Sequence, residues 1–159
     1  MRIHIGGDHA SYELQQALMA HLAEGGHEVV NHGPFAYDAK DDYPVFVLRA
    51  AEAVASDPGS RGIVLGGSGN GEQMAANKVD GVRAALAYST ELAALAREHN
   101  DAQIVSIGAR FTPEDAAKQI VDTFLVTEFS DDERHSRRIG MVSAYEADKV
   151  LPPLPDSAG

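Results

Sequence analysis

The sequence contains no cysteine and no tryptophan, and 24 aspartates and glutamates outnumber its 13 lysines and arginines. The absence of cysteine excludes disulfides, thiolate metal sites and a cysteine nucleophile. No apolar run approaches the ~20 residues that a membrane-spanning helix needs. The start of the chain also lacks the basic, apolar and small-residue pattern of a secretory signal. We therefore expect a cytoplasmic protein with no membrane partner.

The formal net charge of −11 argues against nucleic acid as a partner, because affinity for nucleic acid depends on basic groups that neutralise phosphates. A small anionic ligand would need a local cationic pocket that overrides this field, so a cluster of arginines is informative here. The length of 159 residues and the 44% hydrophobic content are typical of one globular domain. We expect a single domain over residues 1–150 and an irregular, proline-rich tail over 151–159.

Strand-like and helical segments alternate along the chain. Leu14, Leu18 and Leu22 repeat at a helical spacing of four. We expect strands at 2–6, 28–31, 62–65, 82–87 and 103–107, and helices at 12–24, 44–56, 72–78, 90–99, from 112 onward, and at about 131–149. Ser89 and Thr112 are expected as helix caps, with Pro113 in a first turn. This alternation predicts an α/β fold with a five-stranded parallel sheet covered by helices on both faces.

In such sheets, ligands bind beyond the carboxyl ends of the strands. The loops expected there are 7–9, 66–72 and 108–110. The stretch GGSGNGE (66–72) is the strongest local feature, because glycines let backbone N–H groups approach an anion. It matches no dinucleotide fingerprint, P-loop or nucleophile elbow. A plain tight turn needs one or two glycines, so four in six residues favour an oxyanion or phosphate cradle.

Four further features each allow an ordinary and a functional interpretation. Glu72 is either a first-turn acid that complements the helix dipole or a catalytic group beside the cradle. Asp8 and His9 are either loop residues or an acid–base or hydroxyl-binding pair. His99, at a helix end, either contacts free carbonyls or faces a site. Arg134 and Arg138, four apart on one helix face, either balance the acids at 131–133 or clamp a phosphate, with Arg110 as a possible third donor.

These motifs together resemble the ribose-5-phosphate isomerase B family over residues 1 to about 150. The residues that carry the resemblance are Gly7-Asp8-His9-Ala10, Asp42-Tyr43-Pro44, Gly66 to Lys78 (GGSGNGEQMAANK), Arg97-Glu98-His99-Asn100, Gly108-Ala109-Arg110, and Arg134-His135 with Arg138. Many family members have a catalytic cysteine at the position of Gly66. The sequence is similar to an actinobacterial subtype that lacks this cysteine and uses a glutamate at the position of Glu72.

The resemblance implies a Rossmann-like three-layer α/β sandwich, an intramolecular oxidoreductase of the pentose phosphate pathway, and no metal or other cofactor. It also implies a homodimer or homotetramer with sites at the subunit interface. The implied substrate is a phosphorylated sugar, ribose 5-phosphate in exchange with ribulose 5-phosphate. An isomerase of allose, galactose or erythrose phosphate and a non-catalytic sugar-phosphate-binding module remain alternatives.

The resemblance also assigns roles to individual residues. It implies Glu72 as the proton shuttle and Asp8 and His99 as ring-opening groups. The implied oxyanion hole is formed by Gly67, Ser68, Gly69, Asn70 and Gly71. The implied phosphate ligands are His9, Arg110, Arg134 and Arg138. Tyr43, Asn100 and His135 are implied as hydroxyl contacts.

Overall fold

A computed structural model describes residues 1–155 and has one sheet of five parallel strands in the order β2-β1-β3-β5-β4. The strands are β1 (Arg2–Gly6), β2 (Glu28–Asn31), β3 (Arg61–Gly66), β4 (Ala84–Leu86) and β5 (Ile104–Gly108). The helices are α1 (Tyr12–Glu24), α2 (Tyr43–Ser56), α3 (Asn70–Ala76), α4 (Thr90–Asn100), α5 (Glu114–Val126) and α6 (Glu133–Asp148), with a 3-10 turn at His9–Ser11. The predicted α/β class with a five-stranded parallel sheet is confirmed.

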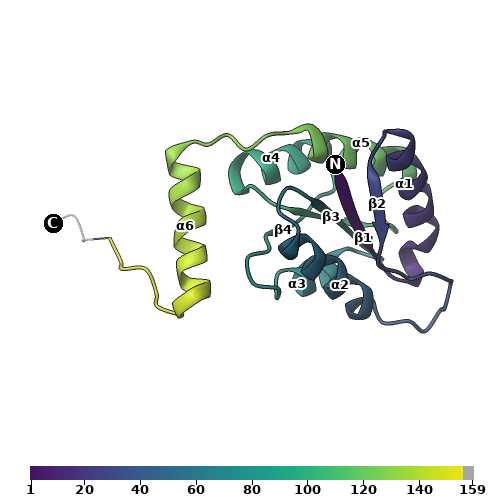
Figure 1. Ribbon diagram of the computed structural model, residues 1–159, viewed down its shortest axis with the longest axis horizontal. Helices are drawn as coiled ribbons and strands as arrows, with labels where there is room; N and C mark the ends of the chain where they lie inside the picture. The colour runs from purple at the N-terminus through teal and green to yellow at the C-terminus, as the bar shows by residue number, and fades with distance from the viewer. Residues whose placement is uncertain (156–159) are drawn as a thin grey trace.

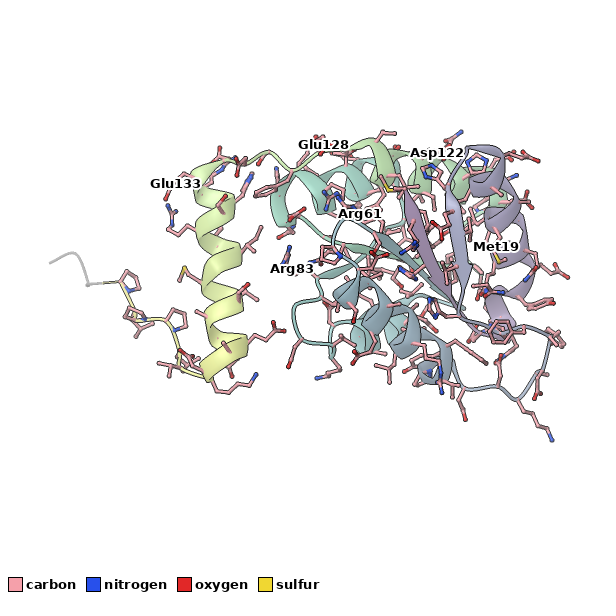
Figure 2. All side chains as sticks on the ribbon, viewed as in Figure 1. Met19, Arg61, Arg83, Asp122, Glu128 and Glu133 are labelled. Atoms are coloured by element: carbon pink, nitrogen blue, oxygen red, sulfur yellow. The ribbon has the colours of Figure 1, made fainter. Side chains whose placement is uncertain are left out.

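Helices cover both faces of the sheet and form the two outer layers (Figure 1). One core cluster joins α1, α4 and α5 to the sheet through residues such as Leu18, Ala93 and Phe124. The other joins α2 and α3 to the opposite face through Val47 and Ala76. In the first layer, Asp122 of α5 lies next to α1 (Figure 2), where its carboxylate is 2.7 Å from Nε2 of His21.

Helix α6 does not belong to either layer. Figure 1 shows it standing apart from the sheet, beyond the edge strand β4, with contact to the body at the end of α4. A single chain leaves most of α6 exposed, including Met141, Val142 and Tyr145. Within residues 1–155, no helix is long and apolar enough to span a bilayer.

Several bounds differ from the sequence prediction by one or two residues; α3, for example, spans Asn70–Ala76 and not 72–78. Strand β4 covers only Ala84–Leu86 of the predicted 82–87, and just before it the N–H of Arg83 donates to the side chain of Gln103 (2.8 Å). Thr112 does not cap α5: Pro113 occupies the cap position, and the Thr112 hydroxyl is buried without a hydrogen-bond partner. The predicted Ser89 cap is confirmed, since its hydroxyl accepts from the N–H of Leu92 (3.2 Å).

The end of the chain is described only in part. Residues 151–155 form no helix or strand, and residues 156–159 of the expected tail lie outside the described residues. The single domain over 1–150 stays a prediction.

Candidate active site

The glycine-rich loop follows β3 and turns into α3 at the carboxyl edge of the sheet. All four carbonyl oxygens of residues 66–69 are occupied by donors from other segments. The donors are the N–H of Ala109 to Gly66 (2.8 Å), the N–H of Arg110 to Gly67 (3.1 Å), the phenol of Tyr88 to Ser68, and the hydroxyl of Ser106 to Gly69 (2.7 Å). No hydrogen bond among the described residues uses the N–H groups of Gly67 or Ser68. The carbonyl oxygens of the loop are therefore engaged elsewhere, and the N–H groups of Gly67 and Ser68 are left to donate to an oxyanion.

Two glycines of this loop are required by geometry. Gly69 has a φ of +80°, in the left-handed region that favours glycine. A Cβ on Gly66 would lie 1.9 Å from Oε1 of Glu72, so only glycine leaves room for that carboxylate. The Glu72 side chain thus fills the space in which a side chain at position 66 would otherwise lie.

Glu72 lies in the first turn of α3 and is only 4% exposed. Burial raises the pKa of its carboxyl above the ordinary value, and the nearby charge of Asp8 adds to the rise. The backbone N–H groups of Glu72 and Gly69 act in the opposite direction. A raised pKa makes this carboxylate a stronger base, which suits a group that takes up and returns a proton at a ligand edge.

Asp8 and His9 follow β1, whose neighbour β3 carries the glycine-rich loop. Asp8 is buried and accepts from the N–H of Ala10 (3.0 Å) as the cap of the 3-10 turn. Strands β1 and β3 lie at the point where the strand order reverses, which is where open α/β sheets bind ligands. Nδ1 of His9 lies 2.7 Å from Oδ1 of Asp41, a residue that the sequence did not single out.

Tyr43 and Arg110 lie over the same loop. A Cβ on Gly71 would be 2.7 Å from the phenol oxygen of Tyr43, and one on Gly67 would be 3.3 Å from the Arg110 guanidinium. In the loop itself, the Ser68 hydroxyl accepts from the side-chain amide of Asn70 (3.2 Å). One chain therefore brings together ten of the predicted site residues. They are Asp8, His9, Tyr43, Gly67, Ser68, Gly69, Asn70, Gly71, Glu72 and Arg110.

The other five predicted residues lie elsewhere: His99, Asn100, Arg134, His135 and Arg138. Helix α4 begins after the carboxyl end of β4 and returns to the amino end of β5, so its 11 residues carry His99 and Asn100 roughly 16 Å back across the sheet. The side chain of Arg83, which precedes β4, accordingly donates to the carbonyl of Asn100 (2.7 Å). No hydrogen bond or ion pair within the described chain links these five residues to the first ten.

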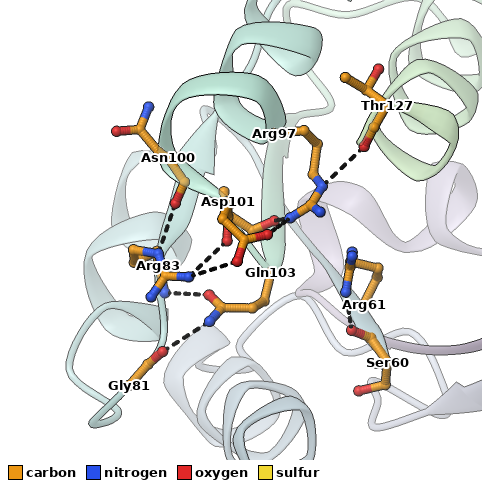
Figure 3. A network of polar contacts seen from close by, with 10 residues as sticks. Ser60, Arg61, Gly81, Arg83, Arg97, Asn100, Asp101, Gln103 and Thr127 are labelled. Carbon is orange, nitrogen blue, oxygen red and sulfur yellow. Dashed lines mark hydrogen bonds and ion pairs between the residues drawn. The ribbon is translucent and has the colours of Figure 1, made fainter. Parts of the chain in front are cut away.

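A polar network fixes the end of α4 (Figure 3). Arg97 is 2% exposed and donates to the Asp101 carboxylate and to the carbonyl of Ala102, both at 2.7 Å. It also reaches the carbonyl of Thr127, just beyond α5 (3.3 Å). Arg97 was visible in the motif 97–100, but nothing in the sequence gave it a role. It ties the end of α4 to the segment that leads into α6.

His99 and His135 lie against each other, with ring centroids 4.3 Å apart. His135 is buried, and Nδ1 of its ring is 2.8 Å from the hydroxyl of Ser130. Burial lowers the pKa of His135, and His99 adds to the effect, which favours the neutral ring. The two histidines, together with the bond from the N–H of Ser130 to the carbonyl of Glu98 (3.1 Å), join α4 to the start of α6.

The arginines of α6 differ in their partners. Arg137 pairs with Glu133 at 2.7 Å, so charge balance explains it. Arg134 is exposed and lies only 3.7 Å from Asp132. Arg138 has no acidic partner within ion-pair distance among residues 1–155 and lines, with Asn100 and Gln73, a groove of about 450 Å³ beside β4. Arg138 thus keeps its guanidinium group for another ligand, and the exposed Arg134 has only a long ion pair to give up.

No group of three or more His, Asp or Glu side chains in the described part of the chain is placed to hold a metal ion. The fold and the loops at its carboxyl edge define an α/β protein of the open parallel-sheet class, with a carboxylate buried beside a glycine-rich loop.

The particular family follows from the sequence. The profile of the Ribose/Galactose Isomerase family matches residues 3–142, and the chain belongs to that family. It is 54% identical to a ribose-5-phosphate isomerase B of Mycobacterium tuberculosis over 98% of this chain and 96% of that protein. It is 52% identical to a ribose-5-phosphate isomerase B of Mycolicibacterium paratuberculosis over the whole of both. A crystal structure of ribose-5-phosphate isomerase B from Mycoplasma genitalium with bound ribulose-5-phosphate superposes with a TM-score of 0.89 at 39% identity, covering 92% of this chain and 97% of that one.

Proposed function

We propose that this protein is an intramolecular oxidoreductase that interconverts ribose 5-phosphate and ribulose 5-phosphate through an enediolate. The observation that carries the proposal is the buried Glu72 carboxylate, held against Gly66 beside a loop with free backbone donors. The relatives named ribose-5-phosphate isomerase B and the relative with bound ribulose-5-phosphate support this substrate.

Glu72 moves the proton. It takes the proton from C2 of the open-chain aldose, and the electron pair passes to the carbonyl oxygen at C1 to give the enediolate. Glu72 then returns the proton to C1, while the hydroxyl proton at O2 is transferred to O1, so the ketose has the same atoms as the aldose. The N–H groups of Gly67 and Ser68 stabilise the charge that develops on oxygen. Gly69, Asn70 and Gly71 keep the loop in this shape.

The remaining residues bind the sugar. Asp8 and His99 open the ring, and His9, Arg110, Arg134 and Arg138 hold the phosphate, which supplies binding energy remote from the reacting carbons. Tyr43, Asn100 and His135 contact hydroxyl groups. The proposal needs no metal or nucleotide, because each step uses a group of the chain itself.

The site is completed by a second chain. The amino edge of the sheet carries His99, and the carboxyl edge carries Glu72, so the two meet only when the end of α4 and α6 from one chain reach the carboxyl edge of another. A symmetric dimer forms two such sites, and a tetramer would contain two dimers. Exposed apolar residues on α6, among them Met141, Val142 and Tyr145, supply surface for this contact. The cytoplasmic location stays an expectation from the sequence.

The test is an isomerase assay over a panel of pentose, tetrose and hexose phosphates in EDTA. We expect turnover of ribose 5-phosphate, loss of turnover in Glu72→Gln by roughly 10²–10⁴-fold, and a smaller loss in Ser68→Ala because neighbouring N–H groups remain. A Glu72→Gln enzyme with most of its turnover would remove Glu72 from the mechanism. Activity that is lost in EDTA and restored by a divalent ion would refute the cofactor-free proposal. A monomer with full activity at high dilution would refute the shared site.

A further inference from the structure

The loop between β2 and α2 holds a carboxylate against His9. Oδ1 of Asp41 accepts from the backbone N–H of His9 (3.0 Å) and lies 2.7 Å from its ring nitrogen Nδ1. The Asp41 side chain is 8% exposed, and His9 is its one basic partner within ion-pair distance among the described residues. These contacts join residues 32 positions apart in the sequence.

The Asp41 carboxylate determines which ring nitrogen of His9 is free. An ionised carboxylate only accepts hydrogen bonds, so Nδ1 of His9 carries the proton in this contact. Nε2, on the far side of the ring, makes no hydrogen bond within residues 1–155. In the neutral ring Nε2 would be an acceptor and would repel a phosphate oxygen. A ring with a proton on both nitrogens can donate from Nδ1 to Asp41 and from Nε2 to a phosphate oxygen at the same time, so this is the form that fits both anions.

The surroundings hold this arrangement rigidly. The Asp41 N–H donates to the carbonyl of Asp38 (3.0 Å), and the Asp38 carboxylate accepts from the N–H of Lys40 (3.0 Å), so the loop is ordered by its own hydrogen bonds. Tyr37 of the same loop meets the His9 ring edge to face, with centroids 6.5 Å apart. The ring of His9 is therefore held by Asp41 at Nδ1 and by the edge-to-face contact with Tyr37.

We infer that Asp41 is a positioning residue that fixes the ring of His9 so that Nε2 donates to the phosphate of the substrate. The inference rests on the proposed function for the identity of that phosphate. Asp41 itself does not touch the substrate. It acts on binding of the phosphate group and not on proton transfer at the sugar carbons.

The first measurement is kinetic. Asp41→Asn keeps a side-chain acceptor but removes the charge, and we expect it to raise KM for ribose 5-phosphate and Ki for inorganic phosphate in parallel by roughly tenfold, as for carboxylates that orient metal-bound histidines. We expect kcat to change by less than about twofold. Asp42→Asn is the matched control, because Asp42 is the exposed neighbour and its side chain makes no cap bond at α2. It removes the same charge from the same loop and should leave KM unchanged.

A double-mutant cycle separates positioning from loop stability. In a His9→Ala background, Asp41→Asn should have no further effect on KM or Ki. Additive effects of the two substitutions on KM would overturn the inference. An equally large effect of Asp41→Asn on the binding of ribose without a phosphate group would overturn it too.

The last measurement needs neither a variant nor turnover. ¹⁵N NMR of the imidazole in the parent protein should show Nδ1 of His9 protonated without ligand, and a proton on both nitrogens after inorganic phosphate is added. A ring protonated only at Nε2, or one that ignores phosphate, would overturn the role of Asp41. Because this readout does not depend on catalysis, failure of the proposed isomerase activity would be recognised separately, in the parent enzyme's own assay.

Discussion

Gly66→Ala tests whether the Glu72 carboxylate must lie against the backbone of β3. A Cβ at position 66 would be 1.9 Å from Oε1 and 2.1 Å from the carboxyl carbon of Glu72. Since ordinary contact needs about 3.5 Å, the carboxylate has to move by roughly 1.5 Å. A displacement of about 1 Å can cost ~100-fold in rate, and loss of a general base costs roughly 10²–10⁴-fold. We therefore expect kcat to fall by at least about 100-fold.

The overpacking should also lower the free energy of unfolding, by about 1–3 kcal/mol. The assay is kcat at saturating ribose 5-phosphate, together with the denaturant midpoint of the same samples. The control is Gly66→Ala in a Glu72→Ala background, where the new methyl group has room and should change neither value. The reasoning is refuted if Gly66→Ala alone keeps more than about a tenth of kcat, or if the two substitutions act additively.

Three more predictions follow from contacts described above. Burial raises the pKa of Glu72, so the ionised carboxylate costs stability at neutral pH, and Glu72→Gln should raise the melting temperature at pH 7. That gain should shrink as the pH falls through the raised pKa, and thermal unfolding at several pH values checks it; a gain that grows in acid would contradict it. Arg138→Ala should raise KM by about 10- to 100-fold, equivalent to about 1.5–3 kcal/mol, whereas Arg137→Ala, which breaks only the pair with Glu133, should leave KM within about twofold. Tyr88→Phe frees the carbonyl of Ser68 and should lower kcat about tenfold with little change in KM; an unchanged kcat in steady-state kinetics would show that the loop holds its shape without that phenol.

Much of the fold follows from local sequence patterns. The spacing of Leu14, Leu18 and Leu22 predicts α1 with the bounds observed, because one buried face requires that period. The glycine-rich stretch after β3 correctly predicts a turn at the carboxyl edge. The prediction that Thr112 caps α5 was wrong, because its hydroxyl is buried while Pro113 takes the cap position. Cap residues alone do not tell which way a side chain turns.

The contacts that shape the site are harder to predict. Asp41 reaches His9 across 32 positions, and Tyr88 reaches Ser68 across 20, through single side chains that belong to no repeating pattern. The position of His99 is a different case. A helix that connects two parallel strands must return to the amino edge, so the order β4-α4-β5 already implied that His99 lies far from Glu72 in the same chain.

This return of α4 has a genetic consequence. If each site combines the carboxyl edge of one chain with α4 and α6 of the other, a chain with Glu72→Gln and a chain with Arg138→Ala fail at different halves of the site. In a mixed dimer, which contains one chain of each kind, both defects fall in one site and the other site is intact. Random mixing makes half of the dimers mixed, so about a quarter of all sites work. A cell that carries both alleles would then contain some intact sites, although neither allele alone encodes one.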